Sequence, residues 1–196
     1  MRRLKPSSKK LPEFVSSVTE IARKPVRVFF QDEACFGRIC QVRKVWLPTG
    51  ERTEVKAQHV RQYTYVYSAI EPKTGESVSL ILPYANTDWM SVFLKELSER
   101  YAEDEIVLVL DGAGWHRSRG LVVPANIRLV CLPPYSPQLN PVEQLWKGVK
   151  ARFFGNAYFE TLEAVESHLV TALRWVEANT AWVKSFAYFP YIQHAI

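Results

Sequence analysis

Three carboxylates occupy places in this chain where an acidic side chain is costly. Asp32 and Asp111 each follow an apolar run typical of a buried strand, and Glu143 lies one turn into a predicted helix. A buried carboxylate needs something to offset its charge, and several at element ends can converge on a divalent cation. Hard oxygen ligands of this kind suit Mg²⁺ or Mn²⁺, and two such ions can clamp the attacking and leaving oxygens of a phosphodiester. These residues therefore favour metal-dependent phosphoryl transfer on nucleic acid.

The elements that must position these carboxylates follow from the hydrophobic periodicity. We expect strands over residues 26–32, 62–70, 77–82, 106–110 and 127–132, a possible strand over 38–47, and helices over 87–101 (capped by Thr87), 141–154 and 161–178. A meander followed by strand–helix alternation predicts an α/β fold, with a mixed sheet and helices on both faces. Ligands of such sheets gather at strand ends where the strand order reverses. Asp32 and Asp111 should therefore lie on neighbouring strands.

The bulk composition limits the class of protein. The chain has 196 residues, which suits one domain, and its net charge of +5 favours a polyanionic partner. Residues 1–10 hold five basic side chains and no acid, so we expect residues 1–25 to be a basic linker or arm and 26–196 to be the domain. Three cysteines without a CxxC pair predict reduced thiols rather than a disulfide framework or zinc site. No apolar stretch predicts a secretory signal or membrane span, so we expect a cytoplasmic protein.

Two of the carboxylates have structural alternatives. Asp111-Gly112 could be an ordinary turn. Asn140-Pro141-Val142-Glu143 could be a capping box, in which Glu143 bonds the Asn140 amide, or Glu143 could form a surface pair with Lys147. Two other carboxylates, Glu33 and Asp88, are weaker candidates that we expect at the surface or at a cap.

Basic and aromatic residues surround the candidate carboxylates. His116 and Arg117 are residue types that stack on bases or contact phosphates. Lys147 and Lys150 are four and seven residues after Glu143, so all three share one helix face that could align a DNA strand. We therefore expect DNA contacts from Arg38, His116, Arg117, Lys147 and Lys150.

Three segments carry a resemblance to a known family. They are Gln31-Asp32-Glu33-Ala34-Cys35-Phe36-Gly37-Arg38, Leu110-Asp111-Gly112-Ala113-Gly114-Trp115-His116 and Leu132-Pro133-Pro134-Tyr135-Ser136-Pro137-Gln138-Leu139-Asn140-Pro141-Val142-Glu143-Gln144-Leu145-Trp146. They resemble the DDE transposases of bacterial insertion sequences, in particular the mariner-like superfamily, over roughly residues 26 to 192. The last segment is the most specific of the three.

The resemblance implies a ribonuclease H-like fold, a mixed five-stranded sheet flanked by helices. Asp32, Asp111 and Glu143 match the family's catalytic and metal-binding triad for two Mg²⁺ or Mn²⁺ ions. The implied activity is cleavage of double-stranded DNA at transposon ends and joining to target DNA, in the cytoplasm at the nucleoid. The family's N-terminal helix-turn-helix is missing here, which implies a homodimer or a partner that carries it. A hydrolytic nuclease of the same fold and a non-catalytic DNA- or transposase-binding remnant are the alternatives.

Overall fold

A mixed sheet of five strands forms the centre of the computed structural model, which describes residues 11–39, 44, 46–51, 54, 56, 58–134 and 136–193. The strands are β1 (Val26–Ile39), β2 (His59–Ile70), β3 (Ser77–Leu82), β4 (Glu105–Leu110) and β5 (Ile127–Cys131), and their order in the sheet is β3-β2-β1-β4-β5. β1, β2 and β3 are antiparallel neighbours, whereas β4 and β5 pair in parallel with β1 and with each other. The expected mixed five-stranded sheet is confirmed.

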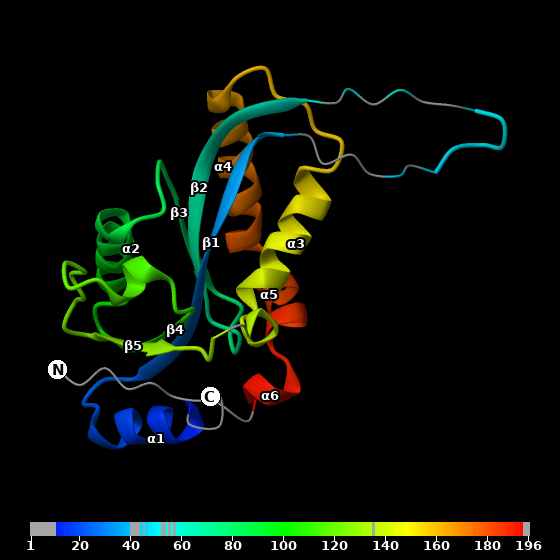
Figure 1. Cartoon of the computed structure of the whole chain (residues 1–196). Helices are drawn as coiled ribbons and strands as arrows, with labels where there is room; N and C mark the ends of the chain where they lie inside the picture. Colours follow the sequence, from blue (N-terminus) through cyan, green and yellow to red (C-terminus); the bar gives the residue numbers. More distant parts are fainter. Residues whose placement is uncertain are drawn as a thin grey trace.

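The central strand β1 is longer than its partner β4. Its pairing with β4 runs from Val26 to Phe30, whereas its pairing with β2 continues to Ile39. The end of β1, from Phe36 to Ile39, forms a two-stranded ribbon with β2, because β3 pairs with β2 only from Tyr65 onward (Figure 1). β4, between β1 and β5, is apolar and buried on both faces, as a covered central strand must be.

Helices cover the two faces of the sheet (Figure 1). One face holds α2 (Thr87–Arg100), and the other holds α3 (Val142–Phe153), α4 (Leu162–Ala178) and α5 (Thr180–Ala187). Because side chains alternate along a strand, Phe29 of β1 joins the core beneath α2 while Phe30 joins the core beneath α3 and α4. β1 therefore contributes buried side chains to a core on each face of the sheet.

Two expectations about the first half of the chain need correction. The linker expected over residues 1–25 is wrong for Leu11–Ile21, which form helix α1 and bury Leu11 and Val18 in the core; residues 1–10 lie outside the described residues. The cap of α2 is Asn86 rather than Thr87, since the Asn86 side chain accepts from the Trp89 amide at 3.0 Å.

The remaining expected elements agree with the structure to within a few residues, with two differences. β1 ends at Ile39, so the possible strand over 38–47 is limited to its first two residues, and residues 40–43 and 45 lie outside the described part. α5 and the short α6 (Pro190–Gln193) were not expected. Within the described residues, no helix is both long and apolar enough to cross a membrane.

Candidate active site

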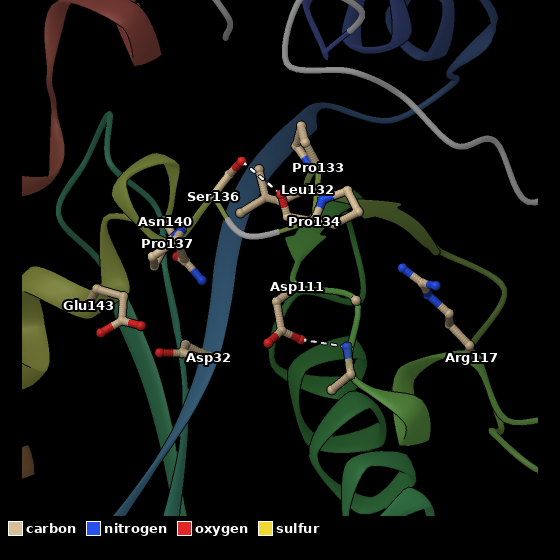
Figure 2. Close-up of a pocket in the computed structure, with 12 residues that line it drawn as sticks. Asp32, Asp111, Arg117, Leu132, Pro133, Pro134, Ser136, Pro137, Asn140 and Glu143 are labelled. Carbon is tan, nitrogen blue, oxygen red and sulfur yellow. Dashed lines mark hydrogen bonds between the residues drawn. The ribbon is translucent and has the colours of Figure 1, made fainter.

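The three carboxylates line one cavity of about 390 Å³ at the end of the parallel strands (Figure 2). Phe30 of β1 lies opposite Val109 of β4, so Asp32 and Asp111 are each two residues beyond that pair and come level with one another. Asp32 thus lies just beyond the last residue of β1 that pairs with β4, and Asp111 is the first residue after β4. The expectation that these two residues would lie on neighbouring strands is confirmed.

Glu143 reaches the cavity because a hydrogen bond from Asn140 holds the start of α3 against β1. Asn140 is buried, and its Nδ2 donates to the Gln31 carbonyl at 2.9 Å while its Oδ1 accepts from the Val142 amide at 3.2 Å. The alternative capping box is not formed, since the Asn140 amide donates to the Pro137 carbonyl at 2.9 Å instead. The side chain of Glu143 faces Asp32 (Figure 2).

Asp32 sits in an environment that disfavours its charge. Burial is the largest cause, followed by the negative charges of Glu143, Glu33 and Asp111, and together they raise the pKa of Asp32 to about 7. The indole Nε1 of Trp146 donates to Asp32 Oδ2 at 3.0 Å and opposes this rise only in part. Trp146 is also part of the core, and nothing in the sequence pointed to its hydrogen bond to Asp32.

Asp111 sits in the opposite kind of environment. Its Oδ1 accepts from His116 Nδ1 and from the Ala113 amide, each at 2.9 Å. The His116 bond is the largest cause of a lowered pKa for Asp111, and the nearby charge of Arg117 acts in the same direction. Burial alone would lower the pKa of His116, but its bonds to Asp111 and Glu33 raise it to about 9.

Divalent metal fits this donor set on chemical grounds. The described ranges hold no group of three His, Cys, Asp or Glu side chains that could hold a metal ion as arranged. However, carboxylate oxygens from three parts of the chain face the same space, and the causes of the raised pKa of Asp32 are burial and three carboxylates, with no cationic side chain of the described residues among them. Oxygen donors with excess negative charge are what Mg²⁺ and Mn²⁺ prefer.

One expected DNA contact is wrong, because the side chain of His116 is fully buried and both of its nitrogens bond carboxylates. Arg117 does line the cavity, with its guanidinium lying across Gly112. Arg38 is largely used within the protein, since it donates to the Phe159 carbonyl at 3.1 Å and to Gln62 Oε1 at 2.8 Å.

The two lysines of α3 differ in exposure. Lys147 is exposed on the helix surface, and the alternative ion pair with Glu143 is not formed within 4.0 Å in the described structure. Lys150 is half-buried, with its Nζ 5.2 Å from the centre of the Phe36 ring. Lys147 is therefore the more accessible of the two to a DNA strand.

Glu33 is the residue that sequence reasoning placed wrongly. It was expected at the surface, yet its side chain is only 7% exposed and its Oε1 accepts from His116 Nε2 at 2.9 Å. The signal was present in the alternation of β1, which puts Glu33 on the same face as Phe29 and Gln31, toward the core beneath α2.

Comparison with known proteins identifies relatives over most of the chain. Residues 27–166 match the family model of the DDE superfamily endonucleases. An uncharacterized protein of Sinorhizobium fredii, y4pE/y4sA, is 38% identical over 112 residues, which are 56% of this chain and 82% of that protein.

Solved structures of the Mos1 transposase share the fold. The Mos1 mariner paired-end complex with Mn matches with a TM-score of 0.66 at 15% identity, covering 95% of this chain and 59% of that one. The Mos1 strand transfer complex matches with a TM-score of 0.63 at 16% identity, covering 95% and 58%. The expected ribonuclease H-like fold is confirmed, and the chain spans about three fifths of the length of the Mos1 chains it matches.

Proposed function

The chain belongs to the DDE superfamily endonucleases, and on that premise we propose that it is the catalytic domain of a mariner-like transposase. Its activity is cleavage of double-stranded DNA at transposon ends and transfer of the cut strand to target DNA. The domain comprises residues 26–196 together with helix α1, which packs on the same core.

One observation carries this proposal: three carboxylates from three separate elements meet in one cavity. A fold gains no stability from this arrangement, since burial and neighbouring negative charges raise the pKa of Asp32 to about 7. Costly charge at a strand end is typical of a functional site. A merely structural role would instead pair Asp32 with a cation.

The residues have distinct roles in the proposal. Asp32 and Asp111 hold one Mg²⁺ or Mn²⁺ and Asp32 and Glu143 hold the second. When bound, the two ions supply charge for the attacking and leaving oxygens of the phosphodiester. Trp146 fixes one oxygen of Asp32 at 3.0 Å, and Asn140 holds the start of α3 against β1, which keeps Glu143 within reach.

The proposed DNA contacts are made mainly by exposed basic residues around the cavity. Arg117 at the cavity rim and Lys147 on α3 can reach phosphates. Lys150 and Arg38 contribute less, because Lys150 lies over the Phe36 ring and Arg38 donates to the Phe159 carbonyl. Such contacts bind DNA without sequence preference. The partners we propose are double-stranded DNA and a second copy of this chain or a protein that carries a helix-turn-helix, and the proposed place of action is the cytoplasm at the nucleoid.

The test uses two DNA probes, a supercoiled plasmid and a labelled duplex with a free 3′-hydroxyl. In strand transfer, that hydroxyl attacks a plasmid phosphorus, forms a new O3′–P bond and displaces the plasmid O3′, which leaves with the proton. We expect Mg²⁺-dependent joining of label to plasmid by the wild type, and none by Asp111→Asn or in EDTA.

The alternatives are outcomes of the same assay. Metal-dependent nicking without joining would identify a hydrolytic nuclease. DNA binding without nicking or joining, in Mg²⁺ and in Mn²⁺, would identify a non-catalytic remnant and overturn the proposal.

A further inference from the structure

His116 is a fully buried side chain that joins two carboxylates from different parts of the chain. It lies on the 3-10 turn η2 (Gly114–Arg117), with Nδ1 2.9 Å from Asp111 Oδ1 and Nε2 2.9 Å from Glu33 Oε1. A ring that faces carboxylate oxygens at both nitrogens donates from both and so carries both protons. The loop after β4 is therefore tied to β1 by a buried cation between two anions.

Glu33 is itself held in one orientation. Its Oε1 accepts from Gln31 Nε2 at 3.0 Å and from Trp115 Nε1 at 3.4 Å, besides the bond from His116. Glu33 points away from the face of β1 that carries Asp32, so it does not belong to the cavity lining. Its hydrogen-bonded link to Asp111 runs through His116.

The effect of this chain of bonds is concentrated on one oxygen of Asp111. Oδ1 has two donors, His116 Nδ1 and the Ala113 amide. The other carboxylate oxygen faces the side of the cavity where Asp32 lies (Figure 2). A carboxylate fixed in this way has lost its rotational freedom before a metal ion binds, so binding does not have to order it.

We propose that Glu33 and His116 are positioning residues, which orient Asp111 toward the metal and increase metal affinity without touching metal or DNA. The inference rests on the proposed function, since it concerns the same site. Outer-shell partners of metal ligands are worth about 10-fold to 100-fold in metal affinity. A role in folding alone would instead change stability and leave metal affinity unchanged.

The experiment measures Mn²⁺ binding by the electron paramagnetic resonance of free Mn²⁺, with thermal unfolding recorded for each protein. His116→Gln should weaken Mn²⁺ binding by about 10-fold or more, because glutamine cannot bridge both carboxylates. His168→Gln is the matched control, since His168 is a half-buried histidine that bonds the Phe153 carbonyl at 2.7 Å, away from the cavity. It should lower the melting temperature without changing the Mn²⁺ affinity.

A second variant tests the inference in case His116→Gln does not fold. His116→Gln alone leaves the charge of Glu33 buried without its cation, which is costly. The double variant Glu33→Gln with His116→Gln removes both charges and should fold. It should lose as much Mn²⁺ affinity as the single variant, because both act through Asp111.

The outcomes separate this inference from the function it rests on. If the wild type binds Mn²⁺, Asp32→Asn does not, and both His116 variants bind more weakly than the wild type, the inference is supported. Wild-type affinity in the double variant, or an equal loss in His168→Gln, overturns it while leaving the proposed function intact. Absence of Mn²⁺ binding by the wild type overturns both.

Discussion

Asp32 and Asp111 face each other across one cavity, yet the protein treats their charges in opposite ways. Asp32 accepts from a neutral donor, the Trp146 indole, and its pKa is raised to about 7 by burial and by neighbouring carboxylates. Asp111 is half-exposed, is bonded to protonated His116, and has a lowered pKa. One carboxylate is therefore kept ionised by a cationic neighbour, whereas burial and the neighbouring carboxylates favour the neutral form of the other.

In the proposed metal site, the difference combines an ordered ligand with a tolerable cost to the metal-free fold. If both aspartates lacked protein cations, the fold would bear the full repulsion of the cluster. If both were paired with histidine or arginine, a metal ion would have to compete with those cations. Dividing the roles keeps Asp111 ordered and leaves the attraction for metal at Asp32.

The largest expected effect comes from removing each charge. Asp32→Asn and Asp111→Asn should each reduce metal-dependent cleavage by more than about 100-fold, since loss of even an outer-shell partner lowers metal affinity or activity by about 10-fold to 100-fold.

The two substitutions should change the stability of the metal-free protein in opposite directions. A pKa raised from 3.8 to about 7 corresponds to about 4 kcal/mol at about 1.4 kcal/mol per pKa unit, and solvent in the open cavity screens part of it.

Asp32→Asn should therefore stabilise the metal-free protein by about 2 kcal/mol at pH 8. Asp111→Asn should destabilise it by about 1 kcal/mol, because His116 loses a charged partner. Denaturant unfolding in EDTA measures both changes. Equal changes of the same sign would break the comparison between the two aspartates.

The next effect is the pH dependence of metal-free stability. Between pH 4 and 7, folded Asp32 keeps a proton that the unfolded chain has released, so stability falls as the pH rises through this window. Folded His116 keeps its proton up to about pH 9, against 6.5 when unfolded, so stability falls again between pH 6.5 and 9. Asp111, with a lowered pKa, loses its contribution only as the pH falls below 3.8.

Variants should remove these windows one at a time. Asp32→Asn should flatten the fall between pH 4 and 7, worth about 2 kcal/mol, and keep the upper window. The double variant Glu33→Gln with His116→Gln should flatten the fall in stability between pH 6.5 and 9 and keep the fall between pH 4 and 7. Urea unfolding across pH 4 to 9.5 in EDTA gives both slopes. A wild-type stability that rises across pH 5 to 7 would contradict the environment described for Asp32.

A smaller effect should follow from the Trp146 indole. Trp146→Phe removes the indole donor to Asp32 and keeps a ring beside Phe36, since the centres of the Trp146 and Phe36 rings lie 5.9 Å apart. The pKa of Asp32 should rise further, so a larger fraction of Asp32 is protonated at pH 7. Because Mn²⁺ binds only the ionised carboxylate, Mn²⁺ affinity at pH 7 should fall by up to about 10-fold. Trp182→Phe is the control, since Trp182 packs against Trp175 on α4. If the two variants have equal Mn²⁺ affinity, the indole serves only packing.

Sequence patterns located the three carboxylates that share the cavity, but not the residues that hold them in place. Asp32 and Asp111 could be found because each follows an apolar run, and Glu143 because Asn140-Pro141 marks a helix start. These are local signals. The bond between His116 and Glu33 joins residues 83 positions apart, and no periodicity links them.

The same limit applies to the elements. α1 was taken for a linker because the basic residues before it dominate the composition, although Leu11, Phe14 and Val18 have helical spacing and meet the core. The capping box at Glu143 was a reasonable local alternative. It is not formed because the Asn140 backbone amide, which Glu143 would have to accept from, donates to the Pro137 carbonyl instead.

The smallest expected effect concerns Arg117, the second cation beside Asp111. A methyl group on Gly112 would overlap the Arg117 guanidinium, which can swing away because its side chain is flexible. Gly112→Ala should therefore leave folding nearly unchanged and displace Arg117 from the cavity rim. One lost phosphate contact should lower the slope of log affinity against log salt by about 0.9 for duplex DNA. Gly114→Ala is the matched control, because a methyl group there meets nothing within 4 Å. If the salt slope is the same in both variants and in the wild type, Arg117 acts only on the charge of Asp111 and the DNA path must run along Lys147 instead.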